Sequence, residues 1–233
     1  IKYEDLQRKA ISEALRKGML VLTGGPGTGK TTTLNAIISI FEDLGIKTLL
    51  AAPTGRAAKR MTEITDRESK TIHRLLEVEF QQGDMPVFRR NYRNPLECDA
   101  IVIDEMSMID AQLFCSLLDA FPLGCRIIMV GDADQLPSVG AGNVLHDIID
   151  AKIVPVIRLN RVFRQAMQSL IVTNAHAIIN GQKMTLDCKD GDFFFMRQHN
   201  PAAAARLIAE LYTERLPAAY GFDPKTDIQV LCP

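Results

Sequence analysis

The chain has 233 residues, of which 47% are hydrophobic and 24% are charged, and its formal net charge is −1. This balance is ordinary for a globular protein with a sizeable core and one or two domains. The near-neutral charge gives no global sign of nucleic-acid binding, so any such surface would be a local patch. No apolar run approaches the length of a membrane span, which argues against a membrane partner.

The cysteines and the first residue bear on the cellular location and the processing of the chain. Five cysteines are widely spread and lack C-x-x-C spacing, which favours reduced thiols and no zinc site. No secretory signal pattern opens the chain, so we expect a cytoplasmic location. Because the first residue is Ile1, we also expect the chain to be an excised or processed piece.

The first elements in chain order are a helix and a strand. Apolar residues between Glu4 and Lys17 have the spacing of an amphipathic helix, which Gly18 closes. Met19 to Leu22 then forms a short apolar strand, followed by a glycine-rich run and a second helix that starts near Thr32.

The glycine-rich run from Gly24 to Thr31 matches G-x-x-x-x-G-K-[ST] between a strand and a helix, the context of a phosphate-binding loop. Its backbone N–H groups and the helix N-terminus would hold phosphates, while Lys30 reaches the β- and γ-phosphates and the Thr31 hydroxyl binds Mg²⁺. The alternative is a glycine turn that merely joins the strand to the helix, but it would require Lys30 and Thr31 to occur at the motif positions by chance. The expected nucleotide contacts are Gly25, Pro26, Gly27, Thr28, Gly29, Lys30, Thr31 and Thr32.

Pro53 to Gly55 end the strand predicted from Lys47 to Ala52. A short basic helix is predicted to follow from Arg56 to Glu63. Donors here, including Arg56, Lys59 and Arg60, could bind backbone phosphates of a nucleic acid without reading bases, but a solvated charged helix explains the composition equally well. The candidate residues are Pro53, Thr54, Arg56, Lys59, Thr71 and His73. His73 is, by itself, more often a structural histidine than a catalyst.

Two short extended segments, Leu76–Phe80 and Val87–Tyr92, predict a β-hairpin with a long loop. The strand Ala100–Ile103, a helix near Ala111–Ala120 and the strand Cys125–Val130 follow. Continuous apolar strands that alternate with helices indicate a doubly wound α/β fold with a parallel sheet.

Polar residues follow two of these strands, at the sheet edge where ligands bind. Asp104 and Glu105 come directly after Ala100–Ile103. Together with the phosphate loop they predict an Mg²⁺-holding aspartate and a general base that activates water. Gln135 lies in the loop after Cys125–Val130, where it could sense a γ-phosphate or simply belong to a polar turn.

We expect a second, unfinished unit from Ala151 onward. Its predicted elements are the strands Val154–Leu159, Phe193–Met196 and Ile228–Leu231 and the helices Gln168–Ile179 and Pro201–Leu216. An arginine after its first strand, Arg161 or Arg164, could neutralise charge on a transferred phosphoryl group, or it could be a surface cation.

Taken in order, these segments resemble a superfamily 1 DNA helicase of the RecD type, the α-subunit type of exodeoxyribonuclease V. Helicase motifs I, Ia, II, III and IV resemble, in turn, the runs Gly24–Thr31, Ala52–Ala58, Asp104–Met108, Gly131–Gly142 and Val162–Gln165. The resemblance selects Arg164 over Arg161 as the arginine finger and implies that Gln7 reads the adenine edge. It also implies a strand-separating role for the hairpin.

The resemblance implies a fold of the P-loop NTPase (RecA-like) class, with helices on both faces of a parallel sheet, a small inserted β-hairpin and part of a second RecA-like domain. The expected domains are motor domain 1A at 1–150 with the hairpin at 76–92, and a truncated domain 2A at 151–233. Motifs V and VI are not found, so we expect these residues to bind ATP but to unwind DNA poorly.

The implied function is ATP- and Mg²⁺-dependent movement on single-stranded DNA and at single-strand/duplex junctions, 5′→3′ in the RecD branch. Other subunits of a helicase–nuclease complex are possible partners. Two alternatives stay open: a nucleotide-gated DNA-binding or partner-docking subunit, and another P-loop phosphotransferase such as a kinase or GTPase. A guanine-reading Asn-Lys-x-Asp run is absent from the sequence.

Overall fold

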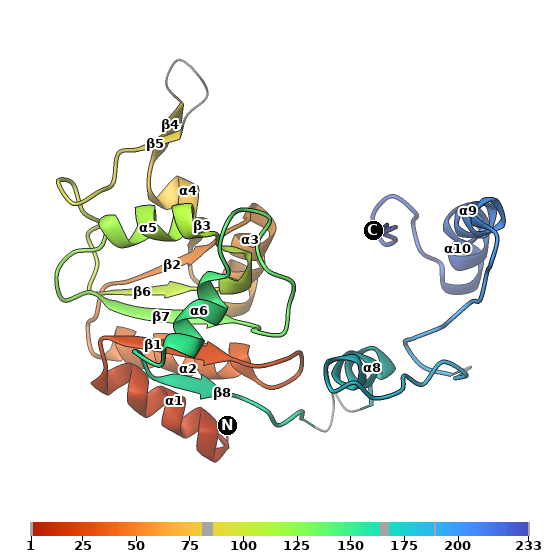
Figure 1. Cartoon of the computed structure of the whole chain (residues 1–233), viewed down its shortest axis with the longest axis horizontal. Coiled ribbons are helices and arrows are strands. Elements are labelled where there is room, and N and C mark those ends of the chain that lie inside the picture. The colour runs from red at the N-terminus through yellow and green to blue at the C-terminus, as the bar shows by residue number, and fades with distance from the viewer. Residues whose placement is uncertain (1, 81–85, 164–167, 189, 233) are drawn as a thin grey trace. The chain divides into compact units, whose positions relative to one another are not determined.

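The computed structural model describes residues 2–80, 86–163, 168–188 and 190–232. The chain divides into two compact units, Ile1–Met184 and Thr185–Pro233. The first unit is an α/β domain and holds every described strand (Figure 1).

The sheet of the first unit has six strands in the order β3-β2-β6-β7-β1-β8, and every neighbouring pair is parallel. The predicted parallel α/β sheet is therefore confirmed. The carboxyl ends of all six strands lie at one edge, so the loops that follow them meet there. The strands are β1 (Met19–Thr23), β2 (Thr48–Ala52), β3 (Ser69–Thr71), β6 (Ala100–Ile103), β7 (Arg126–Gly131) and β8 (Val156–Arg158).

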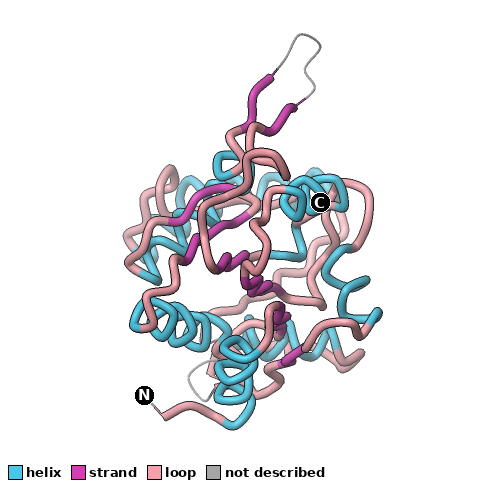
Figure 2. Tube along the Cα trace, turned by 90° about the vertical axis from the view of Figure 1, so that its left-hand side faces the viewer, coloured by secondary structure: helices cyan, strands magenta, loops and turns pink. Residues whose placement is uncertain are grey.

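Helices cover both faces of this sheet (Figures 1 and 2). One buried cluster joins the sheet to α1 (Asp5–Arg16), α2 (Lys30–Asp43) and α3 (Gly55–Thr65). A second cluster joins the other face to α4 (Ile72–Leu75), α5 (Ala111–Asp119) and α6 (Val144–Ala151). Alternate residues of β1, β2, β6 and β7 belong to opposite clusters, which explains why these strands are continuous apolar runs in the sequence.

Local sequence signals set where the helices begin. Glu4 and Gln7 form a reciprocal capping box at the start of α1. Thr54 caps α3 by accepting from the Ala57 N–H at 3.2 Å, and Asp110 caps α5 by accepting from the Leu113 N–H at 2.8 Å. These polar residues satisfy N–H groups that would otherwise lack partners in the first turn.

The predicted hairpin is present, with shorter arms than the sequence suggests. β4 (Val78–Phe80) pairs antiparallel with β5 (Pro86–Phe88), and Val78 lies opposite Phe88. Figure 2 shows the two strands projecting from the sheet. Ion pairs between Arg89 and Glu79 and between Arg90 and Glu77 connect the two arms.

The boundary predicted at 150/151 does not coincide with the division between the two compact units, because the strand that follows it belongs to the first sheet. β8 pairs with β1 as the sixth strand of the first sheet, and the Leu159 N–H donates to the Thr23 carbonyl at 2.8 Å. Helix α8 (Leu170–Ile179) also belongs to the first unit, so the division falls after Met184. An apolar strand shows in the sequence, but the sheet it joins depends on pairing with distant residues.

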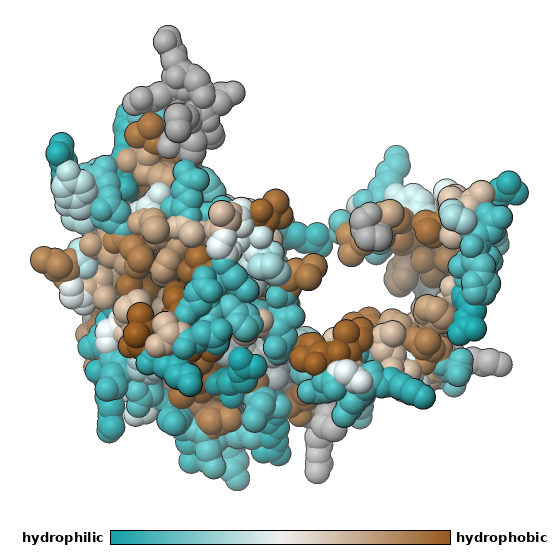
Figure 3. All heavy atoms as spheres, in the orientation of Figure 1, coloured by the Kyte–Doolittle hydropathy of each residue, from teal (hydrophilic) through white to brown (hydrophobic). Residues whose placement is uncertain are grey.

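The second unit is built on helix, not sheet. α9 (Pro201–Glu210) runs through a π-helical turn, Leu211–Arg215, into α10 (Leu216–Tyr220). The strands predicted at 193–196 and 228–231 do not form within its described residues. An extended segment needs a neighbouring strand for its N–H and C=O groups, and an isolated one is not stable. Many apolar side chains here stay exposed, shown brown in Figure 3.

Within the described part of the chain, no helix is long and apolar enough to cross a membrane.

Candidate functional site

A cleft of about 1290 Å³ lies at the carboxyl edge of the sheet, within the first unit. It brings together residues that the sequence places on α1, the phosphate loop and the ends of β6 and β7. The predicted site residues that line it are Gln7, Gly25, Pro26, Gly27, Thr28, Gly29, Lys30, Thr31, Thr32, Asp104, Glu105 and Gln135.

The phosphate loop is packed too closely for larger side chains. Gly29 precedes α2 in the left-handed conformation, with φ of 84°. A Cβ there would lie 2.7 Å from the Gln7 amide nitrogen and 2.7 Å from the Phe163 ring. The Thr28 hydroxyl donates to the Gly25 carbonyl at 2.8 Å and closes the turn. Glycine at position 29 therefore satisfies both the backbone angle and the space.

Lys30 turns its ammonium back onto this loop. Its Nζ donates to the Gly24 carbonyl and, at 3.1 Å, to the Gly25 carbonyl. Burial lowers the pKa of Lys30, although the carboxylates of Asp132, Asp104 and Glu105 oppose that shift. A desolvated cation beside a helix N-terminus is suited to phosphate oxygens.

Two carboxyl groups face this lysine from the end of β6. Burial raises the pKa of Asp104 and of Glu105, and the Asp104 charge raises the Glu105 pKa further. The Glu105 N–H donates to Asp104 Oδ1 at 2.9 Å, and Glu105 itself has a φ of 54°. A non-glycine residue held in this conformation stores strain, which is typical of functional sites.

The loop after β7 is tied to both neighbouring strand ends. The Ala133 N–H donates to the Thr23 hydroxyl at 3.1 Å, which links this loop to the end of β1. The Ser107 hydroxyl donates to Gln135 Oε1 at 2.9 Å, which links it to the segment after β6. Gln135 is otherwise exposed and lines the cleft, and Ser107 leaves its amide N–H₂ group available to another partner.

The segment after β8 runs along the phosphate loop. The Phe163 N–H donates to the Gly27 carbonyl at 3.1 Å, and Arg161 pairs with Glu4 at 2.9 Å. His176 on α8 lies against the same loop, with its Nε2 3.3 Å from the Pro26 carbonyl. Arg164, the expected arginine finger, lies outside the described residues.

Gln7 is almost fully buried in the wall of the cleft. Its Oε1 accepts from the Glu4 N–H at 3.0 Å, and its Nε2 lies 3.4 Å from the Gly29 carbonyl. The Gln7 side chain therefore connects the start of α1 to the phosphate loop.

The residues predicted to bind nucleic acid do not line the cleft. Thr54 lies just after β2 and Thr71 is the last residue of the neighbouring strand β3, and each hydroxyl caps the next helix. Arg56 and Lys59 are exposed on α3, and Pro53 is partly buried before it. The His73 ring lies 5.9 Å from the Phe88 ring of the hairpin, centre to centre.

One acidic and one basic residue of this site, Asp132 and Arg60, were not predicted to belong to it. Asp132 is 5% exposed directly after β7, and its charge acts on Lys30 and Glu105. The rule that singled out Asp104, a carboxylate just after an apolar strand, would have found it. Arg60 lines the cleft from α3, whereas its sequence neighbours suggested a DNA-facing helix.

This fold and site define a class. A parallel sheet whose first strand leads through a glycine-rich loop and lysine into a helix, with carboxylates after a neighbouring strand, is the P-loop NTPase fold.

Comparison with known proteins narrows the class. A family model described as an AAA domain matches residues 7–141. The ATP-dependent RecD2 DNA helicase of Deinococcus radiodurans is 43% identical over 176 residues, 76% of this chain and 24% of the relative. The RecBCD enzyme subunit RecD of Mycobacterium tuberculosis is 41% identical over 171 residues, 63% of this chain and 29% of the relative.

A solved structure agrees on the fold. Pif1 from a Bacteroides species, in complex with ADP-AlF4, superposes with a TM-score of 0.57 at 20% identity, covering 92% of this chain and 58% of that one. The chain spans about a quarter of the length of the curated relatives it matches. It belongs to the AAA-domain family, and the predicted RecD-like resemblance is confirmed.

Proposed function

We propose that this chain is part of the motor of an ATP-dependent DNA helicase, and that its cleft binds and hydrolyses ATP. The observation that carries the proposal is the convergence of Lys30 with Asp104 and Glu105 in one cleft on the phosphate loop. The name of the RecD2 relative, an ATP-dependent DNA helicase, supports the same activity.

The proposed roles follow from the geometry. The phosphate loop and Lys30 hold the β- and γ-phosphates, and Glu105 accepts a proton from the attacking water. Thr31 and Asp104 line the cleft with a hydroxyl and a carboxylate, the oxygen ligands that Mg²⁺ prefers. Bound there, Mg²⁺ would neutralise charge on the phosphates.

We propose further roles for Gln135 and Arg164. Gln135 would contact the terminal phosphate with its amide N–H₂ group while Ser107 fixes its carbonyl end. Arg164 would stabilise charge in the transition state. Gln7 would hydrogen-bond the adenine edge with the second N–H and the second oxygen lone pair of its amide, since Glu4 and Gly29 use one of each.

DNA would run past the ends of β2 and β3, where we place contacts from Pro53, Thr54, Arg56, Lys59, Thr71 and His73. Phosphate contacts of this kind position a strand without reading its sequence. We propose movement on single-stranded DNA in the 5′→3′ direction, action at single-strand/duplex junctions, and work alone or with subunits of a helicase–nuclease complex. We also place motor domain 1A in the first unit, with the hairpin as its inserted element, and the start of domain 2A after it.

The test compares wild type with Lys30→Ala in two measurements. Fluorescent ATP should bind the wild-type chain with Mg²⁺, and Lys30→Ala should weaken that binding about a hundredfold, since a charge-assisted phosphate contact contributes roughly 1.5–3 kcal/mol. Hydrolysis should rise when single-stranded DNA is added. Preference for GTP, or equal binding by Lys30→Ala, would contradict the proposal.

A further inference from the structure

Helix α3 turns one face toward the cleft. Its lining residues are Ala57, Arg60, Met61, Ile64 and Thr65, spaced three and four apart as on a single helix face. Met61 and Thr65 on this face are buried, while Arg60 is exposed at the cleft. Arg60 is therefore the one charged side chain that the described part of α3 brings to the cleft.

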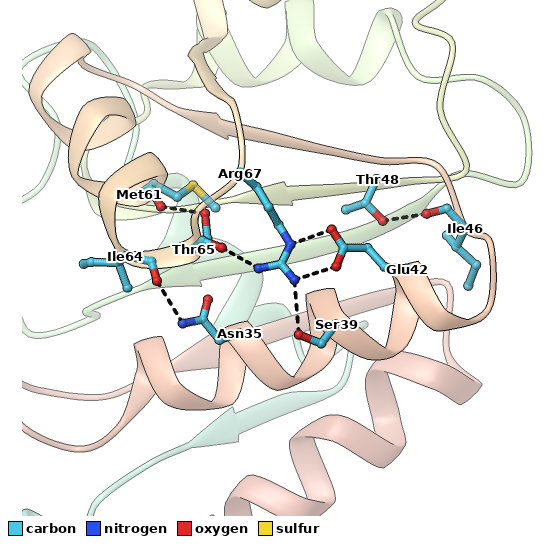
Figure 4. Close-up of polar contacts among 9 residues, drawn as sticks. All are labelled: Asn35, Ser39, Glu42, Ile46, Thr48, Met61, Ile64, Thr65 and Arg67. Carbon is cyan, nitrogen blue, oxygen red and sulfur yellow. Dashed lines mark hydrogen bonds and ion pairs between the residues drawn. The ribbon is translucent and has the colours of Figure 1, made fainter.

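Helix α3 is fixed against α2, the helix that begins at the phosphate loop (Figure 4). Asn35 of α2 donates its Nδ2 to the Ile64 carbonyl at 3.2 Å. Beyond the end of α3, the Arg67 guanidinium donates two hydrogen bonds to the Glu42 carboxylate. It also donates to the Ser39 hydroxyl at 3.2 Å. These contacts set the distance between Arg60 and the phosphate loop.

The positive charge of Arg60 interacts with the ionisable groups of Lys30, Asp104 and Glu105 in the cleft. Its charge adds a small contribution to the lowered pKa of Lys30 and partly opposes the rise that burial causes in the pKa values of Asp104 and Glu105. Its neighbour Lys59 pairs with Glu63 at 3.9 Å, whereas Arg60 makes no ion pair with any carboxylate in the described ranges. A guanidinium that lines a cleft without its own carboxylate is suited to an anion.

We propose that Arg60 is a second phosphate-binding cation of this cleft and contacts the terminal phosphate of a nucleoside triphosphate. The proposal rests on the proposed function, because it requires ATP in the cleft. The terminal phosphate is the one in question because Arg60 lines the same cleft as Asp104 and Glu105, the two residues proposed to act at that end of the nucleotide.

The position of Arg60 connects the nucleotide to the proposed DNA surface. The same helix is capped by Thr54 and also carries the exposed residues Arg56 and Lys59. Departure of the terminal phosphate would therefore remove a contact from the same helix that carries residues placed at the DNA strand.

The experiment measures the binding of fluorescent ADP and of a fluorescent β,γ-imido ATP analogue to Arg60→Gln, Arg60→Lys and wild type. Arg60→Gln should weaken the triphosphate about tenfold or more and the diphosphate less than threefold, because only the triphosphate supplies the missing contact. Arg60→Lys should lie between them, since it keeps the charge and loses the planar fork. Thermal melting of each variant checks that it is folded.

Arg16→Gln is the matched control, because Arg16 is exposed in the last turn of α1 and does not line the cleft. Its affinities should equal those of wild type. Equal losses of both nucleotides in Arg60→Gln, or no loss, would overturn the role of Arg60. Lys30→Ala separates the two ideas: if it still binds both nucleotides, the proposed function itself fails, whatever Arg60→Gln does.

Discussion

The Ser107 hydroxyl donates to Gln135 Oε1 at 2.9 Å, and this bond joins the loops that follow the neighbouring strands β6 and β7. Ser107 is 6% exposed, so its hydroxyl has little access to water as an alternative partner. The bond fixes which end of the Gln135 amide faces the cleft. A change at Ser107 should therefore act on Gln135 without touching the phosphate loop.

Ser107→Ala should lower ATP hydrolysis about fivefold and leave ATP affinity within about twofold, because a lost hydrogen bond of this kind is worth roughly 1 kcal/mol. Steady-state hydrolysis and fluorescent-nucleotide titration measure the two effects. Ser116→Ala is the control, since the Ser116 hydroxyl bonds back to the Gln112 carbonyl on an exposed part of α5. Wild-type hydrolysis by Ser107→Ala would show that the bond has no role in turnover.

Asp104→Asn should raise the free energy of unfolding at pH 7 by about 1 kcal/mol, the usual gain from relieving a destabilised functional group. Burial raises the pKa of Asp104 in the folded chain, so ionisation is costly there. This penalty is absent below the unfolded pKa and present above the folded one. Urea unfolding without Mg²⁺ at pH 7 and near pH 3.5 measures it, and the gain should disappear at the lower pH.

Asp187→Asn provides the comparison, because Asp187 is exposed and far along the chain from this site. It should change stability by less than about 0.5 kcal/mol at either pH. A loss of stability in Asp104→Asn would mean that its carboxylate stabilises the fold.

Arg67→Gln should destabilise the first unit by about 1 kcal/mol at pH 7, a modest value because the pair is partly screened by solvent. The hydrogen bond from Arg67 holds the pKa of Glu42 below its usual value. The stabilisation is therefore present above the unfolded pKa of Glu42 and is lost as the pH falls through the folded one. Unfolding free energies from pH 7 to pH 3 should show wild type and variant converging.

Gly140→Ala should destabilise the chain by about 1–3 kcal/mol, the range for overpacking a close contact. A Cβ at Gly140 would overlap the Asp110 side chain, which caps α5. Gly18→Ala is the matched control, since a Cβ there meets nothing within 4 Å. Thermal melts of the two variants make the comparison, and equal melting temperatures would contradict the close packing of Gly140.

That the phosphate loop and the carboxylates would lie in one cleft could be predicted, because each element has a local signal. The loop from Gly24 to Thr31 lies in a strand–loop–helix context, and Asp104 follows an apolar strand directly. Both signals are read from consecutive residues. The roles proposed for Gln135 and the DNA-facing residues depend on ligands and remain predictions.

What could not be predicted depends on contacts between distant residues. β8 joins the first sheet through pairing with β1, more than a hundred positions away along the chain, and no local pattern reveals that choice. β3 (Ser69–Thr71) was missed because it is short and polar. Arg60 was grouped with its basic neighbours, since the helix face that it shares with Met61 and Thr65 becomes visible only once α3 packs on α2.

The two outer strands of the sheet, β3 and β8, have three residues each. Lys70 and Arg158 add a positive charge to each of these edges. Short, charged edges offer few unpaired backbone groups to another chain, which is how natural sheets resist edge-to-edge aggregation. The strand order that gathers the ligand-facing loops thus also protects the domain from β-mediated self-association.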